Sequence, residues 1–211
     1  MTRNWQHGRE ERDARIESAG QLAKGNLVEL RDATRLLEAV IRPGDRVCLE
    51  GDNRRQADTL CAALLAVDVN KVNGLHIVLS GAVLPEHLDL FDRGVAKRRD
   101  FAYSGPQSAR IAAMRFAGKT ELGAVHMYLE LFARYFIDLT PNVALSAAIS
   151  ADRGGNLHSG PNTEDTPRTA RPANDEQQLC RCDWRIGPVI PENGIGPQGH
   201  NSQQPGRAST D

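Results

Sequence analysis

Apolar residues in the middle of the chain occur in short runs that alternate between two spacings. Some runs are compact and rich in Val, Ile and Leu, as in buried strands, and others repeat their apolar positions at helical spacing. The predicted strands cover residues 46–50, 75–79, 100–103, 121–125 and 143–149. The predicted helices cover residues 32–41, 56–67, 85–97, 107–117 and 128–136. This alternation predicts an α/β fold with a mostly parallel sheet and covering helices.

The chain divides into three predicted zones. Residues 1–26 are charged and contain a helical stretch over residues 9–23, which we interpret as a solvated lead-in helix. Residues 27–167 form the α/β body. Residues 168–211 contain few aliphatic side chains among repeated prolines and glycines, so they cannot bury enough apolar area to offset the entropy of ordering. We therefore expect this last zone to be disordered.

Charge and composition exclude several classes of protein. The 211 residues carry 26 Lys and Arg against 27 Asp and Glu, which gives a formal net charge of −1 and no global attraction to nucleic acid or anionic lipid. No run reaches the roughly 18 apolar residues that a membrane-spanning helix needs. The four cysteines are too few for a disulfide framework. We expect a cytoplasmic protein that binds neither nucleic acid nor membrane.

Three short patterns suggest chemistry that their context does not support. Residues 194–199 match G-x-G-x-x-G, but no predicted strand precedes them and no helix follows, so we interpret the match as chance. Cys180 and Cys182 have no second pair of ligands, so no metal site is expected. The run Lys97-Arg98-Arg99 is too brief to indicate nucleic-acid binding, and we interpret it as a solvated face.

Six runs of the body follow one another in the order of a known family. They are RPGDRVCLEG (42–51), LPEHLDLFDRG (84–94), DFAYSGPQSAR (100–110), ELGAVHMYLELF (121–132), ADRGGNL (151–157) and GPNTEDTP (160–167). Over about residues 5–167 the chain thereby resembles the amino-terminal part of the malonate decarboxylase α subunits, within the wider coenzyme A transferase group. One short run would be a weak signal, but the ordered series is specific. It implies a coenzyme A transferase-like domain.

The resemblance also implies an activity, that of an acyl-carrier-protein transferase. Such a subunit exchanges the acetyl group of a carrier thioester for malonate, which releases acetate and leaves a malonyl thioester for other subunits to decarboxylate. The thiol belongs to a coenzyme-A-like phosphopantetheine group on the carrier protein, so no covalently bound cofactor is expected on this chain. The implied partners are that carrier protein, the other malonate decarboxylase subunits, malonate and acetate.

Two other functions stay open. The chain could be a non-catalytic assembly module that docks partner subunits, or another coenzyme A transferase of the citrate lyase α type. The family pattern also stops at Pro167, so we expect residues 168–211 to be a non-native or frame-shifted end and the subunit to be truncated and impaired. If neither other reading frame after codon 167 restores an apolar α/β pattern, the frame-shift hypothesis is wrong.

Candidate site residues lie in the loops that follow predicted strands, where parallel sheets bind ligands. Thioester exchange needs a held carrier arm, an oriented carboxylate and stabilisation of the carbonyl oxygen. We predict His126 and Glu164 as catalytic candidates. The predicted carrier- and substrate-binding residues are Gly51, Asn53, Gln56, Ser104, Gly105, Gln107, Arg110, Asn156 and Thr163.

Each of these predictions has a structural alternative. Arg110 could bind a malonate carboxylate through its guanidinium, or it could form a surface salt bridge. Ser104 could cap a turn, and Thr163 and Glu164 could cap a helix. His126 could be a hydrogen-bonded structural histidine, and His87 is expected to pack inside the fold. Glu50 is assigned no acyl-intermediate role.

Overall fold

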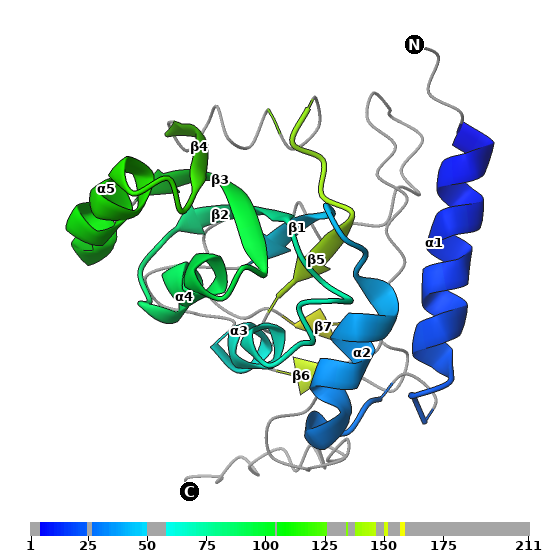
Figure 1. Cartoon of the computed structure of the whole chain (residues 1–211). Helices are drawn as coiled ribbons and strands as arrows, with labels where there is room; N and C mark the ends of the chain where they lie inside the picture. The colour runs from blue at the N-terminus through cyan, green and yellow to red at the C-terminus, as the bar shows by residue number, and fades with distance from the viewer. Residues whose placement is uncertain are drawn as a thin grey trace, which may run out of the picture.

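The computed structural model describes residues 5–24, 27–49, 58–103, 105–125, 134, 138–146, 150–151 and 157–158. Their centre is a parallel five-stranded sheet with the strand order β4-β3-β2-β1-β5 (Figure 1). Its strands are β1 (Arg46–Leu49), β2 (Leu75–Gly81), β3 (Ala96–Tyr103), β4 (Glu121–Val125) and β5 (Val143–Leu145). β6 (Ser150–Ala151) and β7 (Leu157–His158) form a separate antiparallel pair. The predicted parallel α/β fold is confirmed.

One face of the sheet is covered by helices. These are α2 (Ala33–Val40), α3 (Asp58–Leu65), α4 (Glu86–Asp92) and α5 (Ser108–Phe116), while the turns η1 (Leu30–Asp32) and η2 (Gly105–Gln107) precede α2 and α5. Each of α3, α4 and α5 joins neighbouring parallel strands in one direction, and right-handed crossovers place such helices on the same face. Their apolar side chains form one core with alternate residues of the strands, such as Ile77 and Leu79.

The opposite face of the sheet is built differently. β5 pairs with β1 at the edge of the sheet opposite to β4, and the described residues just before β5 lie on this second face. Leu139 lies there, buried against Cys48 and Val78. Because neighbouring residues of a strand point to opposite faces, the polar residues of β1, β2 and β3 that alternate with the core residues also point here.

The predicted helix over residues 85–97 is wrong at its end. α4 stops at Asp92, and β3 begins at Ala96 rather than at residue 100. Gly94 has φ +77°, a left-handed conformation that ends helices and that favours glycine. The Leu75 N–H then donates to the Val95 carbonyl at 3.0 Å, which begins the pairing of β3 with β2.

The basic run is therefore part of a strand, and the interpretation as a solvated face is wrong for its last residue, Arg99. Lys97 and Arg98 are exposed, but Arg99 is fully buried, with its guanidinium carbon 5.3 Å from the Phe91 ring centroid and 5.6 Å from that of Phe101. Its Nη2 donates to the Ile111 carbonyl at 3.3 Å. Burial lowers the Arg99 pKa to about 10. The charge of Arg99 wrongly predicted a surface position, because its place in the strand directs its side chain to the buried face of the sheet.

The first helix is not a solvated lead-in either. α1 (Trp5–Gly20) lies beside α2 (Figure 1), and Ala19 is buried against Val28 and Leu36. Arg15 of α1 is also buried and reaches Asp45, in the turn before β1. The prediction of a helix is right, but its inner side is part of the fold. None of the described helices combines the length and apolar composition that a membrane crossing requires.

Candidate functional site

The parallel strands end at one edge of the sheet, and the loops that follow them hold most of the candidate residues. β1 ends at Leu49, just before Gly51, Asn53 and Gln56 in the sequence. The strand order reverses between β1 and β5, and crevices at such switch points are where open α/β sheets bind ligands. The topology therefore agrees with the choice of the loop after β1. These three residues lie outside the described residues.

The turn after β3 is held by its own hydrogen bonds. Gly105 adopts φ +48°, and its carbonyl accepts from the Ser108 hydroxyl at 2.8 Å. The Gln107 Nε2 group donates to the Val83 carbonyl at 3.3 Å, which links the turn after β3 to the loop after β2. Two neighbouring loops of the carboxyl edge are thus joined through the Gln107 amide.

Arg110 is engaged by two carboxylates of α4. Its Nη2 lies 2.5 Å from Asp89 Oδ1 and 2.9 Å from Asp92 Oδ2, and its Nη1 donates to the Pro85 carbonyl at 3.0 Å. The hydrogen bond to Asp89 is the largest influence that raises the Arg110 pKa. These contacts agree with the alternative interpretation of Arg110, in which it forms a salt bridge. A substrate carboxylate at Arg110 would have to compete with both aspartates, so a role in binding malonate stays a prediction.

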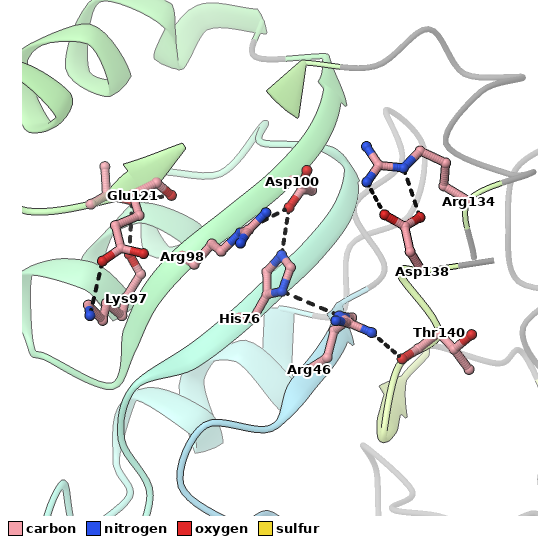
Figure 2. Close-up of polar contacts among 10 residues, drawn as sticks. Arg46, His76, Lys97, Arg98, Asp100, Glu121, Arg134, Asp138 and Thr140 are labelled. Carbon is pink, nitrogen blue, oxygen red and sulfur yellow. Dashed lines mark hydrogen bonds and ion pairs between the residues drawn. The ribbon is translucent and has the colours of Figure 1, made fainter. Parts of the chain in front are cut away.

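A chain of polar side chains that the sequence analysis missed crosses the second face of the sheet (Figure 2). The Arg46 Nη1 group donates to the Thr140 carbonyl at 2.8 Å, and its Nε group donates to His76 Nδ1 at 3.3 Å. His76 Nε2 lies 2.6 Å from Asp100 Oδ2, and Arg98 Nε is 3.6 Å from the same oxygen. The side chain of Asp100 is fully buried.

The hydrogen bonds of this polar chain indicate the tautomer of His76. A guanidinium N–H can only donate, so Nδ1 accepts from Arg46 and the proton is on Nε2, which donates to Asp100. Both ring nitrogens of His76 are then engaged by protein side chains. We interpret the polar chain as a tie between β1, β2 and β3. The sequence contained one signal for this contact: His76 lies between Leu75 and Ile77 in a strand, so its side chain points to the opposite face of the sheet from theirs.

Gly123 of β4 makes room for the Asp100 carboxylate. A Cβ atom at position 123 would lie 2.2 Å from Asp100 Oδ2 and 2.5 Å from Oδ1. We expect Gly123→Ala to lower the free energy of unfolding by about 1–3 kcal/mol, because the buried carboxylate must move. Denaturant unfolding measures this change. Gly20→Ala is the control, since a Cβ there meets nothing within 4 Å; equal stability of the two variants would contradict the prediction.

Cysteine and metal chemistry find no support in the described part of the chain. Cys48 and Cys61 are buried and form no disulfide with each other, and burial raises the Cys61 pKa to about 12, so Cys61 is protonated at neutral pH. No group of three or more His, Cys, Asp or Glu in the described ranges is arranged to hold a metal ion. Cys180 and Cys182 lie outside those ranges.

Several predicted site residues cannot be placed. They lie outside the described residues, and their roles stay predictions: Gly51, Asn53, Gln56, Ser104, His126, Asn156, Thr163 and Glu164. β4 ends at Val125, so His126 is the next residue after the carboxyl end of a strand. The structure describes Gly105, Gln107 and Arg110. It brings Gln107 against the loop after β2 and Arg110 against α4.

Comparison with known proteins identifies the family. A family model described as malonate decarboxylase, alpha subunit, transporter matches residues 4–180. The chain belongs to this malonate decarboxylase α subunit family. The acetyl-S-ACP:malonate ACP transferase of Malonomonas rubra is 53% identical over 156 residues, which are 74% of this chain and 28% of that protein.

Two solved structures are also similar to this malonate decarboxylase α family member. The malonate decarboxylase α subunit from Acinetobacter baumannii is 42% identical with a TM-score of 0.76, and the match covers 79% of this chain and 31% of that one. A chain of a Pseudomonas malonate decarboxylase hetero-tetramer in complex with malonate is 46% identical with a TM-score of 0.76, covering 81% and 31%. The chain thus spans less than a third of the length of these relatives.

Proposed function

We propose that this chain is part of an acyl-carrier-protein transferase subunit of malonate decarboxylase. The subunit exchanges the acetyl group of a carrier thioester for malonate, so that acetyl-S-carrier and malonate give malonyl-S-carrier and acetate. The observation that carries the proposal is the 53% identity to the acetyl-S-ACP:malonate ACP transferase. The parallel sheet, with candidate residues in loops at one edge, supports it.

The proposal includes several finer assignments. The α/β body over residues 27–167 has the coenzyme A transferase-like fold, the helix within residues 1–26 packs against it, and residues 168–211 are a separate tail. The subunit acts in the cytoplasm on the coenzyme-A-like phosphopantetheine group of a carrier protein, within an assembly of malonate decarboxylase subunits. A relative that is part of a hetero-tetramer supports the assembly. The loop residues predicted from the sequence hold the carrier arm and malonate, and His126 and Glu164 are the catalytic candidates.

The chain spans less than a third of the length of its relatives, so a binding measurement tests the proposal more directly than the activity of the whole subunit does. We expect malonate and coenzyme A, used as a soluble probe of the carrier arm, each to stabilise the chain. At ten times its Kd a ligand adds about 1.4 kcal/mol, which raises the unfolding midpoint by about 3–6 °C. Acetyl-carrier with labelled malonate then reports exchange as one acetate released per malonyl thioester formed.

The alternatives give different results in the same assays. A shift with citrate but not with malonate would favour the citrate lyase α type. Binding of partner subunits without any shift by malonate or coenzyme A would favour an assembly module, and the transferase proposal would then be wrong.

A further inference from the structure

Helix α5 has a second apolar face that points to solvent. Its inner face buries Ile111 and Met114 in the core. Phe116 is 90% exposed, far more than Leu30 at 42% and Val69 at 37%, the other exposed large apolar residues in the described part of the chain. Ala109, Ala112 and Ala113 are exposed as well, and they precede Phe116 by seven, four and three residues, so all four lie on one side of the helix.

The charges around this face select what can cover it. From Ser108 to Thr120 the sequence has Arg110, Arg115 and Lys119 and no carboxylate. Arg110 is paired with Asp89 and Asp92, and Lys119 lies 2.7 Å from Asp92. Arg115, next to Phe116, is exposed and forms no ion pair with any residue that the structure describes. A second copy of this chain would bring the same cation and no carboxylate on its own α5.

We propose that the outer face of α5, formed by Ala109, Ala112, Ala113, Arg115 and Phe116, docks a partner protein. The matching surface has an apolar pocket for Phe116 and a carboxylate beside it for Arg115. Aromatic and arginine side chains are the residues that most often dominate such interfaces, and the small alanines let a partner's backbone approach closely.

The position of this face indicates which partner it binds. α5 begins after the carboxyl end of β3 and runs toward the start of β4, so Phe116 lies at the far end from the loops of the candidate site. A protein on the outer face of α5 leaves those loops accessible to a carrier arm. The partner is therefore a stably bound subunit of the assembly rather than the carrier arm; this identity rests on the proposed function.

The test measures binding of the purified chain to its cognate malonate decarboxylase subunits by sedimentation or calorimetry. Phe116→Ser is expected to weaken the Kd by about 30-fold and Arg115→Glu by about 10-fold. Leu30→Ser, which changes an exposed leucine on η1, is the matched control and should bind as the unchanged chain does. Unfolding midpoints of all variants establish that the fold is retained.

The remaining outcomes separate this inference from the proposed function. Unchanged binding by Phe116→Ser and Arg115→Glu overturns the docking site, and so does a chain that binds none of the subunits. A dimer that Phe116→Ser converts to a monomer shows that a second copy is the occupant and also overturns it. Stabilisation by malonate and coenzyme A should persist in Phe116→Ser, because these ligands bind at the other end of α5. If malonate and coenzyme A do not stabilise the unchanged chain, that result counts against the proposed function and not against the docking site.

Discussion

Replacing Asp45 by alanine should lower the free energy of unfolding by about 3–5 kcal/mol, because it leaves a buried arginine without its main partner. Asp45 Oδ2 accepts from Arg15 Nη1 at 2.5 Å, and Oδ1 accepts from Arg15 Nη2 at 3.1 Å. Only 10% of the Arg15 side chain and 8% of the Asp45 side chain are exposed. Asp45 Oδ2 also accepts from the Arg42 backbone N–H at 2.7 Å.

The effect of Asp45→Ala should reach beyond its own turn. Arg15 belongs to α1, and its Nη1 also donates to the carbonyl of Val40, the last residue of α2, at 3.0 Å. After the change, the Arg15 guanidinium keeps two partners, the Val40 carbonyl and the half-exposed Glu11, which lies 2.6 Å from Nη2. Because Glu11 still offers a charge, we expect the lower end of the range. Hydrogen exchange of the α1 amides should rise with the loss of global stability.

Denaturant unfolding at neutral pH measures the prediction, with Asp13→Ala as the control. Asp13 is on the same helix and pairs with Arg12 at 3.1 Å, but 59% of its side chain is exposed, so its removal should cost less than about 1 kcal/mol. A double-mutant cycle with Arg15→Ala should give a coupling energy of at least about 2 kcal/mol. Equal stability of Asp45→Ala and Asp13→Ala would show that the buried pair does not hold α1 in place.

The order of elements in the body could be predicted because each signal was local. The apolar run of β2 and the helical spacing of α2 depend on neighbouring residues, and both occur where expected. The end of α4 was misplaced because Ala96 to Arg99 become a strand only by pairing with β2, a partner far from them in the sequence. Strand pairing of this kind cannot be seen in a short stretch of sequence, so the charges of Lys97, Arg98 and Arg99 suggested a surface position instead.

The site could be predicted only as far as the topology carries it. Parallel strands bring their following loops to one edge, which is why Gly105 and Gln107 could be chosen from the sequence. The partners of Arg110 could not be chosen, because Asp89 and Asp92 belong to a different helix. The tie between His76 and Asp100 was missed for the same reason, since their contact depends on the register of β2 against β3.

The second large effect is a loss of stability at acid pH that depends on His87. His87 lies on α4 and is 1% exposed, and neither ring nitrogen has a hydrogen-bond partner among the described residues. Burial lowers the His87 pKa to about 4, while the neighbouring carboxylate of Glu86 acts in the opposite direction. The predicted packing role of His87 agrees with this burial.

The direction of the pH effect follows from proton uptake. In the unfolded chain His87 has its ordinary pKa of about 6.5, so between about pH 6.5 and 4 the unfolded state binds a proton that the folded state does not. Stability therefore falls as the pH falls through this interval, by about 1.4 kcal/mol per pH unit and about 3 kcal/mol by pH 4. Above about pH 7 the histidine is neutral in both states and adds no slope.

His87→Leu should remove this slope, because leucine fills a similar volume and does not titrate. It should also raise stability at neutral pH by about 1 kcal/mol or more, since it removes buried nitrogens without partners. Unfolding free energies of both proteins at pH 7, 6, 5 and 4 give the test, because their difference cancels the contributions of all other groups. That difference should grow by about 3 kcal/mol toward pH 4, whereas Glu86→Gln, an exposed change on the same helix, should show little of it. A difference between His87→Leu and the unchanged chain that stays constant with pH would mean that His87 is protonated without cost inside the fold.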